Sequence, residues 1–287
     1  MPGPTFTTPS SRQVPGSPHP DADSRFSVRE FARTARGSHR SELDLDAYRD
    51  APLDQETLEI VDLLARLERG ALSYLRSVLV TPTHKDARVT AFLVTWAYEK
   101  YWVADALELV VAAHPGYTPT PTRGVPRLKR VWHALGERLE PIRESVVANL
   151  IGEDVIAVHT AAGALDEWIT LAAYERLVQG PHAEFTRTLA TLLDVKRRHG
   201  EFFAADAADR LAASPHAGRL ARRRLSRAAW PLGSADEPPA LLARLLGGVI
   251  PASDLTAIDA RVDALPGLAG LNLTTTAARR ARKAAGE

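Results

Sequence analysis

The chain has 287 residues, of which 45% are hydrophobic, and a formal net charge of +1. This length and apolar content allow a sizeable core, and the near-zero charge gives no overall attraction to nucleic acid or to an acidic surface. The absence of cysteine excludes disulfides, thiolate metal ligands and cysteine nucleophiles. No stretch predicts a membrane span, and residues 1–13 lack the apolar centre of a signal peptide, so we expect a cytoplasmic protein.

Residues 1–45 are predicted to form a disordered tail. Six prolines lie within the first 20 residues, among serine, threonine and glycine, and few apolar groups are available for burial. This composition favours a solvated extension, with a docking peptide for a larger assembly as the alternative. The folded part is therefore expected to begin near residue 46.

Four long helices are predicted between residues 53 and 213. In the first, Asp54 is a suitable N-cap, apolar residues recur at helical spacing, and Thr81-Pro82-Thr83 ends the helix. The others are expected over residues 86–113, 153–178 and 182–213, each closed by a proline-containing turn. A further helix is expected over residues 127–149, and strand signals are nearly absent. Residues 46–215 are therefore predicted to form an all-α bundle.

Residues 216–287 are predicted to form a helical extension. Helices are expected over residues 219–229, 241–246 and 254–264, and residues 277–287 have the composition of a basic, alanine-rich tail. Between the first two helices, residues 230–233 (Trp-Pro-Leu-Gly) are expected to dock this extension back onto the bundle.

Each long helix interrupts its apolar stripe with a polar or charged residue. A helix that packs against a core on one side normally keeps that stripe apolar, so these interruptions are candidates for a functional site. They are Glu68 on the first helix, Lys100 on the second, Glu167 on the third, and Lys196 with His199 on the fourth. If the four stripes converge, two carboxylates, two ammonium groups and one imidazole meet at one level of the bundle.

Four segments carry a resemblance to a known family. The segments LERGALSYL, FLVTWAYEKYWVADALELV, DEWITLAAYERL and DVKRRHGEFFAADA resemble the four helices of ferritin-like di-iron proteins, close to the acyl desaturases. In that family the helices supply Glu, Glu-x-x-His, Glu and Glu-x-x-His, which clamp two irons that activate dioxygen. The resemblance implies an all-α fold, namely a ferritin-like four-helix bundle with additional C-terminal helices.

The resemblance also implies that the metal site is degenerate. Glu68, Glu167 and His199 match three of the six ligand positions. The other three positions are occupied by Lys100, Val103 and Lys196. Two lysines among two glutamates can neutralise carboxylates that the family neutralises with iron, because an unpaired buried carboxylate is costly.

Two neighbouring carboxylates do not restore the missing ligands. Glu99 is one residue from Lys100, which turns it by about 100° around the helix axis. Asp194 is two residues from Lys196 and lies on the far side of its helix. We therefore expect Lys100 and Lys196 themselves to contact Glu68 or Glu167.

The leading functional hypothesis is a relative of the di-iron oxidases and desaturases that has lost part of its metal site. It would need no cofactor and would act as a partner protein or through a repurposed polar pocket in the core. The first alternative is an active non-haem iron oxidoreductase, an oxygenase or desaturase, that binds iron through Glu68, Glu167 and His199. Whether the altered core is catalytic or a structural relic stays open.

The second alternative is a helical binding module that uses a basic helix. Residues 219–227 contain a run of arginines, namely Arg219, Arg222, Arg223, Arg224 and Arg227. With a net charge near zero, a solvated face is favoured over a nucleic-acid surface. The partners we expect are instead a second copy of the chain, another protein, or a small apolar ligand inside the bundle.

Overall fold

The computed structural model describes residues 26–121 and 152–286. Within these two ranges every regular element is helical and no strand occurs, which confirms the all-α fold class. The helix expected over residues 127–149 lies outside the described residues, as do residues 1–25.

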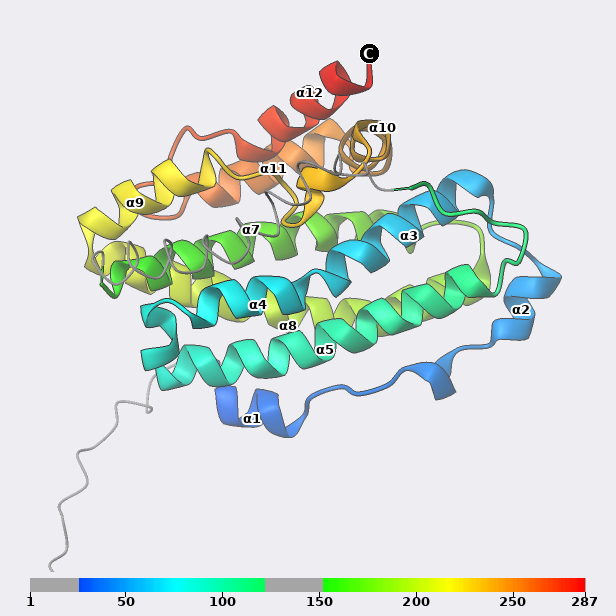
Figure 1. Cartoon of the computed structure of the whole chain (residues 1–287), viewed down its shortest axis with the longest axis horizontal. Coiled ribbons are helices and arrows are strands. Elements are labelled where there is room, and N and C mark those ends of the chain that lie inside the picture. Colours follow the sequence, from blue (N-terminus) through cyan, green and yellow to red (C-terminus); the bar gives the residue numbers. More distant parts are fainter. Residues whose placement is uncertain (1–25, 122–151, 287) are drawn as a thin grey trace, which may run out of the picture.

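Four long helices lie side by side at the centre of the molecule (Figure 1). They are α3 (Gln55–Arg69), α5 (Ala87–Ala112), α7 (Asp154–Leu177) and α8 (Ala183–Ala213), and we call them the central helices. The strongest packing is between α7 and α8 and between α3 and α5. The first predicted helix is divided at Gly70 into α3 and the shorter α4 (Ala71–Leu79), which is followed by the 3-10 turn η2 (Pro82–Lys85).

Side-chain caps fix where three of the central helices begin. The Asp54 carboxylate accepts a hydrogen bond from Thr57 N at 2.9 Å, and Asp86 accepts from Val89 N at 2.9 Å. His182 Nδ1 accepts from Phe185 N at 3.1 Å. Each cap satisfies a backbone N–H that has no partner within its helix, so these helices start at defined residues.

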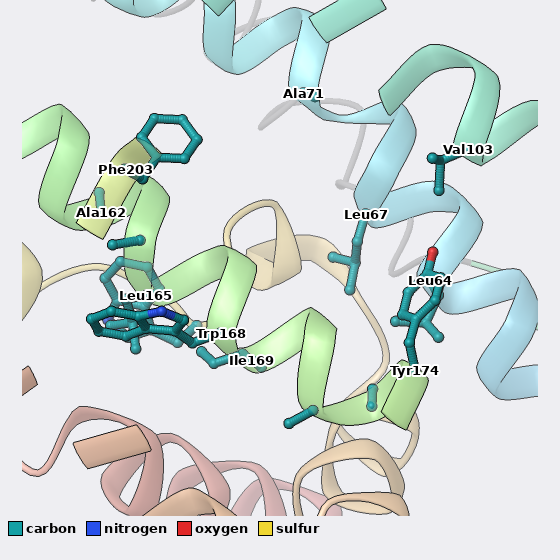
Figure 2. Close-up of a cluster of buried hydrophobic side chains, with 14 of the residues drawn as sticks. Leu64, Leu67, Ala71, Val103, Ala162, Leu165, Trp168, Ile169, Tyr174 and Phe203 are labelled. Atoms are coloured by element: carbon teal, nitrogen blue, oxygen red, sulfur yellow. The ribbon is translucent and has the colours of Figure 1, made fainter. Parts of the chain in front are cut away.

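The central helices enclose a close-packed apolar core, part of which is drawn in Figure 2. Leu64 of α3, Val103 of α5 and Ile169 of α7 are fully buried in it. A Cβ atom on Gly163 would lie 2.5 Å from the Phe203 ring, which is closer than packed atoms approach. Glycine at this position therefore allows α7 and α8 to pack at short distance.

The N-terminal segment covers the outer side of α5, which corrects the predicted tail. Residues 26–44, which we call the strap, contain α1 (Val28–Arg33) and the 3-10 turn η1 (Arg40–Glu42), and α2 (Leu45–Asp50) follows. Phe31 is buried and stacks on Phe92 of α5, with ring centroids 5.0 Å apart. The prediction of disorder over residues 1–45 is therefore wrong for residues 26–45, because a few aromatic groups suffice to attach the strap.

The C-terminal helices pack on the opposite side of the molecule from the strap (Figure 1). They are α9 (Pro215–Leu225), α10 (Pro239–Ala243), α11 (Ala252–Asp263) and α12 (Leu273–Ala285), with the short turns η3 (Ser234–Asp236) and η4 (Arg244–Val249). The predicted basic tail is thus largely part of a helix. Trp230 is buried and Leu232 N donates to Asp166 Oδ1 of α7 at 2.8 Å, which confirms that residues 230–233 dock onto the bundle.

No single helix in the described ranges is long and apolar enough to cross a membrane. One bent pair, Pro239–Val249 with Ala252–Asp263 at 92°, passes the same length and composition test when its two parts are taken together. Leu245 and Ile258, one from each part, are buried within the described fold.

Candidate functional site

Four charged side chains, one from each central helix, meet in the interior of the protein. They are Glu68 of α3, Lys100 of α5, Glu167 of α7 and Lys196 of α8, and none is more than 1% exposed. We call these four residues the ionic cluster. The prediction that the polar interruptions of the four stripes converge is confirmed for this set.

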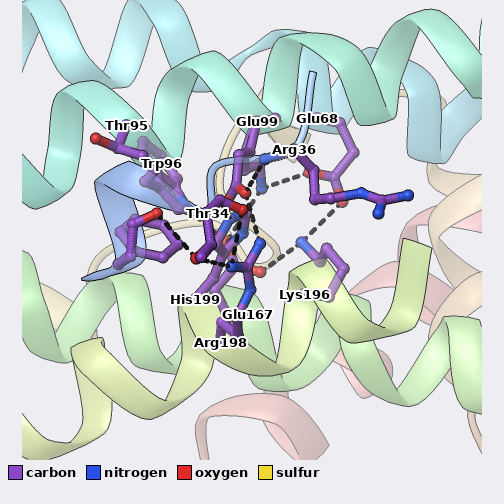
Figure 3. A network of polar contacts seen from close by, with 12 residues as sticks. Thr34, Arg36, Glu68, Thr95, Trp96, Glu99, Glu167, Lys196, Arg198 and His199 are labelled. Atoms are coloured by element: carbon purple, nitrogen blue, oxygen red, sulfur yellow. Dashed lines mark hydrogen bonds and ion pairs between the residues drawn. The ribbon is translucent and has the colours of Figure 1, made fainter. Parts of the chain in front are cut away.

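The ionic cluster alternates positive and negative groups. Lys196 Nζ lies 2.5 Å from Glu167 Oε2 and 2.8 Å from Glu68 Oε1 (Figure 3). Lys100 Nζ lies 2.7 Å from Glu68 Oε2 and 3.4 Å from Glu167 Oε1. Each carboxylate therefore faces both ammonium groups, and all four carboxylate oxygens have an ammonium neighbour. The expected pairing of Lys100 and Lys196 with Glu68 or Glu167 is confirmed.

Aromatic side chains complete the surroundings of the two carboxylates. Trp96 Nε1 donates to Glu167 Oε1 at 2.7 Å, and the Tyr174 hydroxyl donates to Glu68 Oε1 at 3.3 Å. Lys100 Nζ also lies 5.3 Å from the centre of the Trp96 ring, within the range of a cation–π interaction. Uncharged hydrogen-bond donors thus help the lysines to stabilise two carboxylates that are buried away from water.

The electrostatics of the cluster favour the charged forms of Glu68, Glu167 and Lys100. Burial alone would raise the pKa of the Glu68 and Glu167 carboxyls, but the Lys100 and Lys196 ammonium groups outweigh burial and hold both pKa values below the ordinary value. Burial alone would lower the pKa of Lys100, and the carboxylates of Glu167 and Glu68 raise it instead. Charge is therefore balanced within the cluster.

Asp166 is a third acidic group at the edge of the cluster. Its Oδ2 lies 3.7 Å from Lys100 Nζ, and its Oδ1 accepts the backbone hydrogen bond from Leu232. Burial raises the pKa of Asp166 to about 6, because Lys100 is already shared by Glu68 and Glu167 and only partly offsets the desolvation. Asp166 thus takes up a proton more readily than Glu68 or Glu167.

Glu99 is a buried site residue whose role is not evident from the sequence. Glu99 Oε1 accepts from Arg36 N at 2.7 Å and from Arg198 Nη2 at 2.6 Å, and Glu99 Oε2 lies 2.8 Å from His199 Nε2 (Figure 3). Arg198 also donates to the Thr34 carbonyl oxygen at 3.3 Å. Glu99 therefore joins α5, α8 and the strap at one carboxylate.

The remaining candidates differ in how close they come to the cluster. His199 is fully buried, and its Nδ1 lies 3.6 Å from Glu167 Oε1. His199 therefore lies between Glu99 and Glu167 and links the contacts around Glu99 to the ionic cluster. Val103 is buried in the apolar core one turn beyond Lys100, and the Asp194 side chain is 83% exposed, on the far side of α8 as expected.

These residues do not fit a di-iron centre. The four carboxylate oxygens that would bind iron already face ammonium groups, and an added cation would lie beside Lys100 and Lys196. In the described ranges no group of three or more histidine, aspartate or glutamate side chains is arranged to hold a metal ion. The geometry instead ties four helices together through a closed set of charges.

Comparison of the chain with protein-family models, with curated proteins and with solved structures finds no match. The likeness of the central helices to ferritin-like proteins therefore rests on the four sequence segments alone. Function has to be inferred from the residues of the site.

Proposed function

We propose that this protein is a ferritin-like relative of the di-iron oxidases in which two lysines replace the metal centre, and that it acts as a partner protein. The observation that supports this most directly is the position of Lys196 Nζ, within 2.8 Å of both Glu68 and Glu167. An ammonium group in that position supplies the positive charge that iron would supply, without redox chemistry. Glu68 and Glu167 would then act as charge partners of the lysines and not as metal ligands.

Stability alone does not account for four charged residues in the core. Replacing a buried ion pair by packed apolar residues is often neutral or stabilising, whereas removing one member of the pair is strongly destabilising. A core that loses its metal but keeps the carboxylates around it needs a new source of positive charge among them. Lys100 and Lys196 meet that requirement, which supports descent from a metal-binding bundle.

A partner role is favoured over a repurposed core pocket because the cluster is closed to solvent. Glu68, Glu167 and Lys196 are fully buried, and their charged atoms are engaged with one another. Large apolar side chains are exposed elsewhere, on α5, and offer a surface for protein contact; they are Val94, Tyr98 and Tyr101. Sedimentation velocity of the wild type and of a Tyr98→Ser, Tyr101→Ser variant tests whether the partner is a second copy.

The first alternative, an iron oxidoreductase, is less well supported. Glu68 and Glu167 would have to release both lysines before they and His199 Nδ1 faced a common metal. The second alternative, a basic binding module, draws on the exposed arginines of α9, and a salt-dependent shift of a nucleic-acid probe tests it.

Iron loading tests the proposal. After growth with iron supplementation, we expect far less than two irons per chain by elemental analysis, because two ammonium groups repel a bound cation. The triple variant Lys100→Glu, Val103→His, Lys196→Glu should gain iron and an oxo-bridged absorption band in air, because it restores both Glu-x-x-His pairs. Close to two irons in the wild type would overturn the proposal, and a folded triple variant without iron would overturn the ferritin-like descent.

A further inference from the structure

The C-terminal helices enclose a cleft that is separate from the ionic cluster. It has a volume of about 500 Å³ and lies between the end of α9, the start of α10 and one face of α12. Its apolar lining includes Leu225, Trp230, Leu242 and Ala281. A volume of this size and an apolar lining are typical of sites for small organic ligands.

Two arginines from distant parts of the chain line this cleft. Arg227 follows α9 and Arg280 belongs to α12, and both are exposed. Neither guanidinium forms a hydrogen bond or ion pair with any residue that the structure describes. By contrast, Arg66, Arg88 and Arg176 each hold an aspartate or glutamate in an ion pair. Arg227 and Arg280 therefore have donors available for a ligand.

Among the described residues that line the cleft, the one acidic side chain is already paired with an arginine. Glu237 accepts three hydrogen bonds from the Arg66 guanidinium, at 2.9, 3.0 and 3.1 Å. Residues 216–287 contain 11 lysines and arginines against 6 aspartates and glutamates, although the whole chain has a net charge of only +1. Positive charge is thus concentrated in the part of the protein that contains the cleft.

We propose that the cleft binds a small organic anion with an apolar body and a carboxylate or phosphate head. The guanidinium groups of Arg227 and Arg280 would hold the head, because arginine donates paired hydrogen bonds to both kinds of anion. The apolar body would lie along Trp230, Leu242 and Ala281. This site is independent of the ionic cluster and does not rest on the function proposed above.

Calorimetric titration of the full chain with decanoate, decyl phosphate and decanol tests the site. We expect saturable binding of the two anions and none of decanol, which has the same apolar chain and no charge. Arg227→Gln and Arg280→Gln should each weaken decanoate binding by about tenfold, the effect of losing one charge-assisted hydrogen bond. Arg223→Gln and Arg279→Gln are matched controls, since they remove exposed arginines of α9 and α12 that do not line the cleft, and they should bind decanoate like the wild type.

Ala277→Phe provides a second test that leaves every charge in place. Ala277 lines the cleft, so a phenyl ring there should abolish binding of decanoate while the circular dichroism and melting temperature remain those of a folded protein. Equal weakening in all four arginine variants would mean general charge attraction and would overturn the proposal. Binding of decanol as tight as that of decanoate would also overturn it. The same holds if the protein sediments with phosphatidylglycerol vesicles but does not bind decanoate.

Discussion

His199 Nε2 lies 2.8 Å from Glu99 Oε2, and both side chains are fully buried. This contact connects two parts of the interior, because Glu99 also accepts from the backbone of Arg36 in the strap, while His199 Nδ1 faces Glu167 of the ionic cluster at 3.6 Å. The strap is therefore attached to the same network of charges that holds the central helices together.

Replacing Glu99 should destabilise the protein far more than replacing an exposed glutamate of the same helix. Glu99→Ala removes the acceptor for Arg36 N, Arg198 and His199, and leaves the buried imidazole without this partner. We expect a loss of roughly 3 kcal/mol or more in the free energy of unfolding, measured by urea denaturation. Glu108→Ala is the control; its pair with Arg69 is exposed, so the cost should stay below about 1 kcal/mol. Equal costs would contradict the network.

Phe31→Ala should show that the strap is part of the folded structure. Phe31 is buried against Phe92, and removing a buried phenyl ring typically costs about 3–5 kcal/mol. The exposed Arg29, on the same short helix, serves as the control, and Arg29→Ala should leave the melting temperature nearly unchanged. If Phe31→Ala melts like the wild type, residues 26–45 contribute no packing energy, as the composition of the segment suggests.

Buried Asp166 and half-buried His159, both on α7, should give opposite pH dependences between pH 4.5 and 6. The pKa of Asp166 is raised by burial to about 6, so the folded protein keeps a proton that the unfolded chain releases, and stability falls as pH rises through this range. The pKa of His159 is lowered by burial to about 4, so the unfolded chain takes up a proton that the folded protein does not, and stability rises with pH. In the wild type these two contributions oppose each other.

Single substitutions should separate the two contributions. Asp166→Asn removes the contribution that decreases with pH. The free energy of unfolding of this variant should therefore rise with pH relative to the wild type, by up to about 1.4 kcal/mol per pH unit. His159→Gln removes the contribution that increases with pH, so the free energy of unfolding of this variant should fall with pH relative to the wild type. Urea denaturation at several pH values measures both slopes. Parallel pH profiles in the wild type and both variants would refute these protonation states.

The central helices and the ionic cluster are predictable from sequence for a clear physical reason. Each helix has a long apolar stripe and a proline-containing stop, and a charged residue within such a stripe has to find a partner in the core. Glu68, Lys100, Glu167 and Lys196 are therefore recognisable without a structure. Their exact pairing and the donors Trp96 and Tyr174 are not, since an aromatic residue on an apolar stripe is compatible with ordinary packing.

The packing of the strap and the burial of Glu99 are not predictable from the sequence, and the reason is the same for both. Averaged over residues 1–45, the proline-rich composition hides Phe31 and the other groups that attach the strap to α5. With the strap assigned as a tail, the sequence indicates no element that would cover the side of α5 that carries Glu99. The strap covers that side, so a carboxylate turned about 100° from Lys100 is buried all the same.

A double-mutant cycle between Lys196 and Glu167 tests the central claim that lysine charges balance the buried carboxylates. Urea denaturation is measured for the wild type, Lys196→Met, Glu167→Gln and the double variant, with Arg197→Met as a control because Arg197 is half exposed on the same helix. We expect each buried single change to cost on the order of 3–5 kcal/mol and the double variant to cost clearly less than their sum, since each single change leaves its partner charge uncompensated. Single costs as small as that of Arg197→Met, or strictly additive ones, would contradict the account.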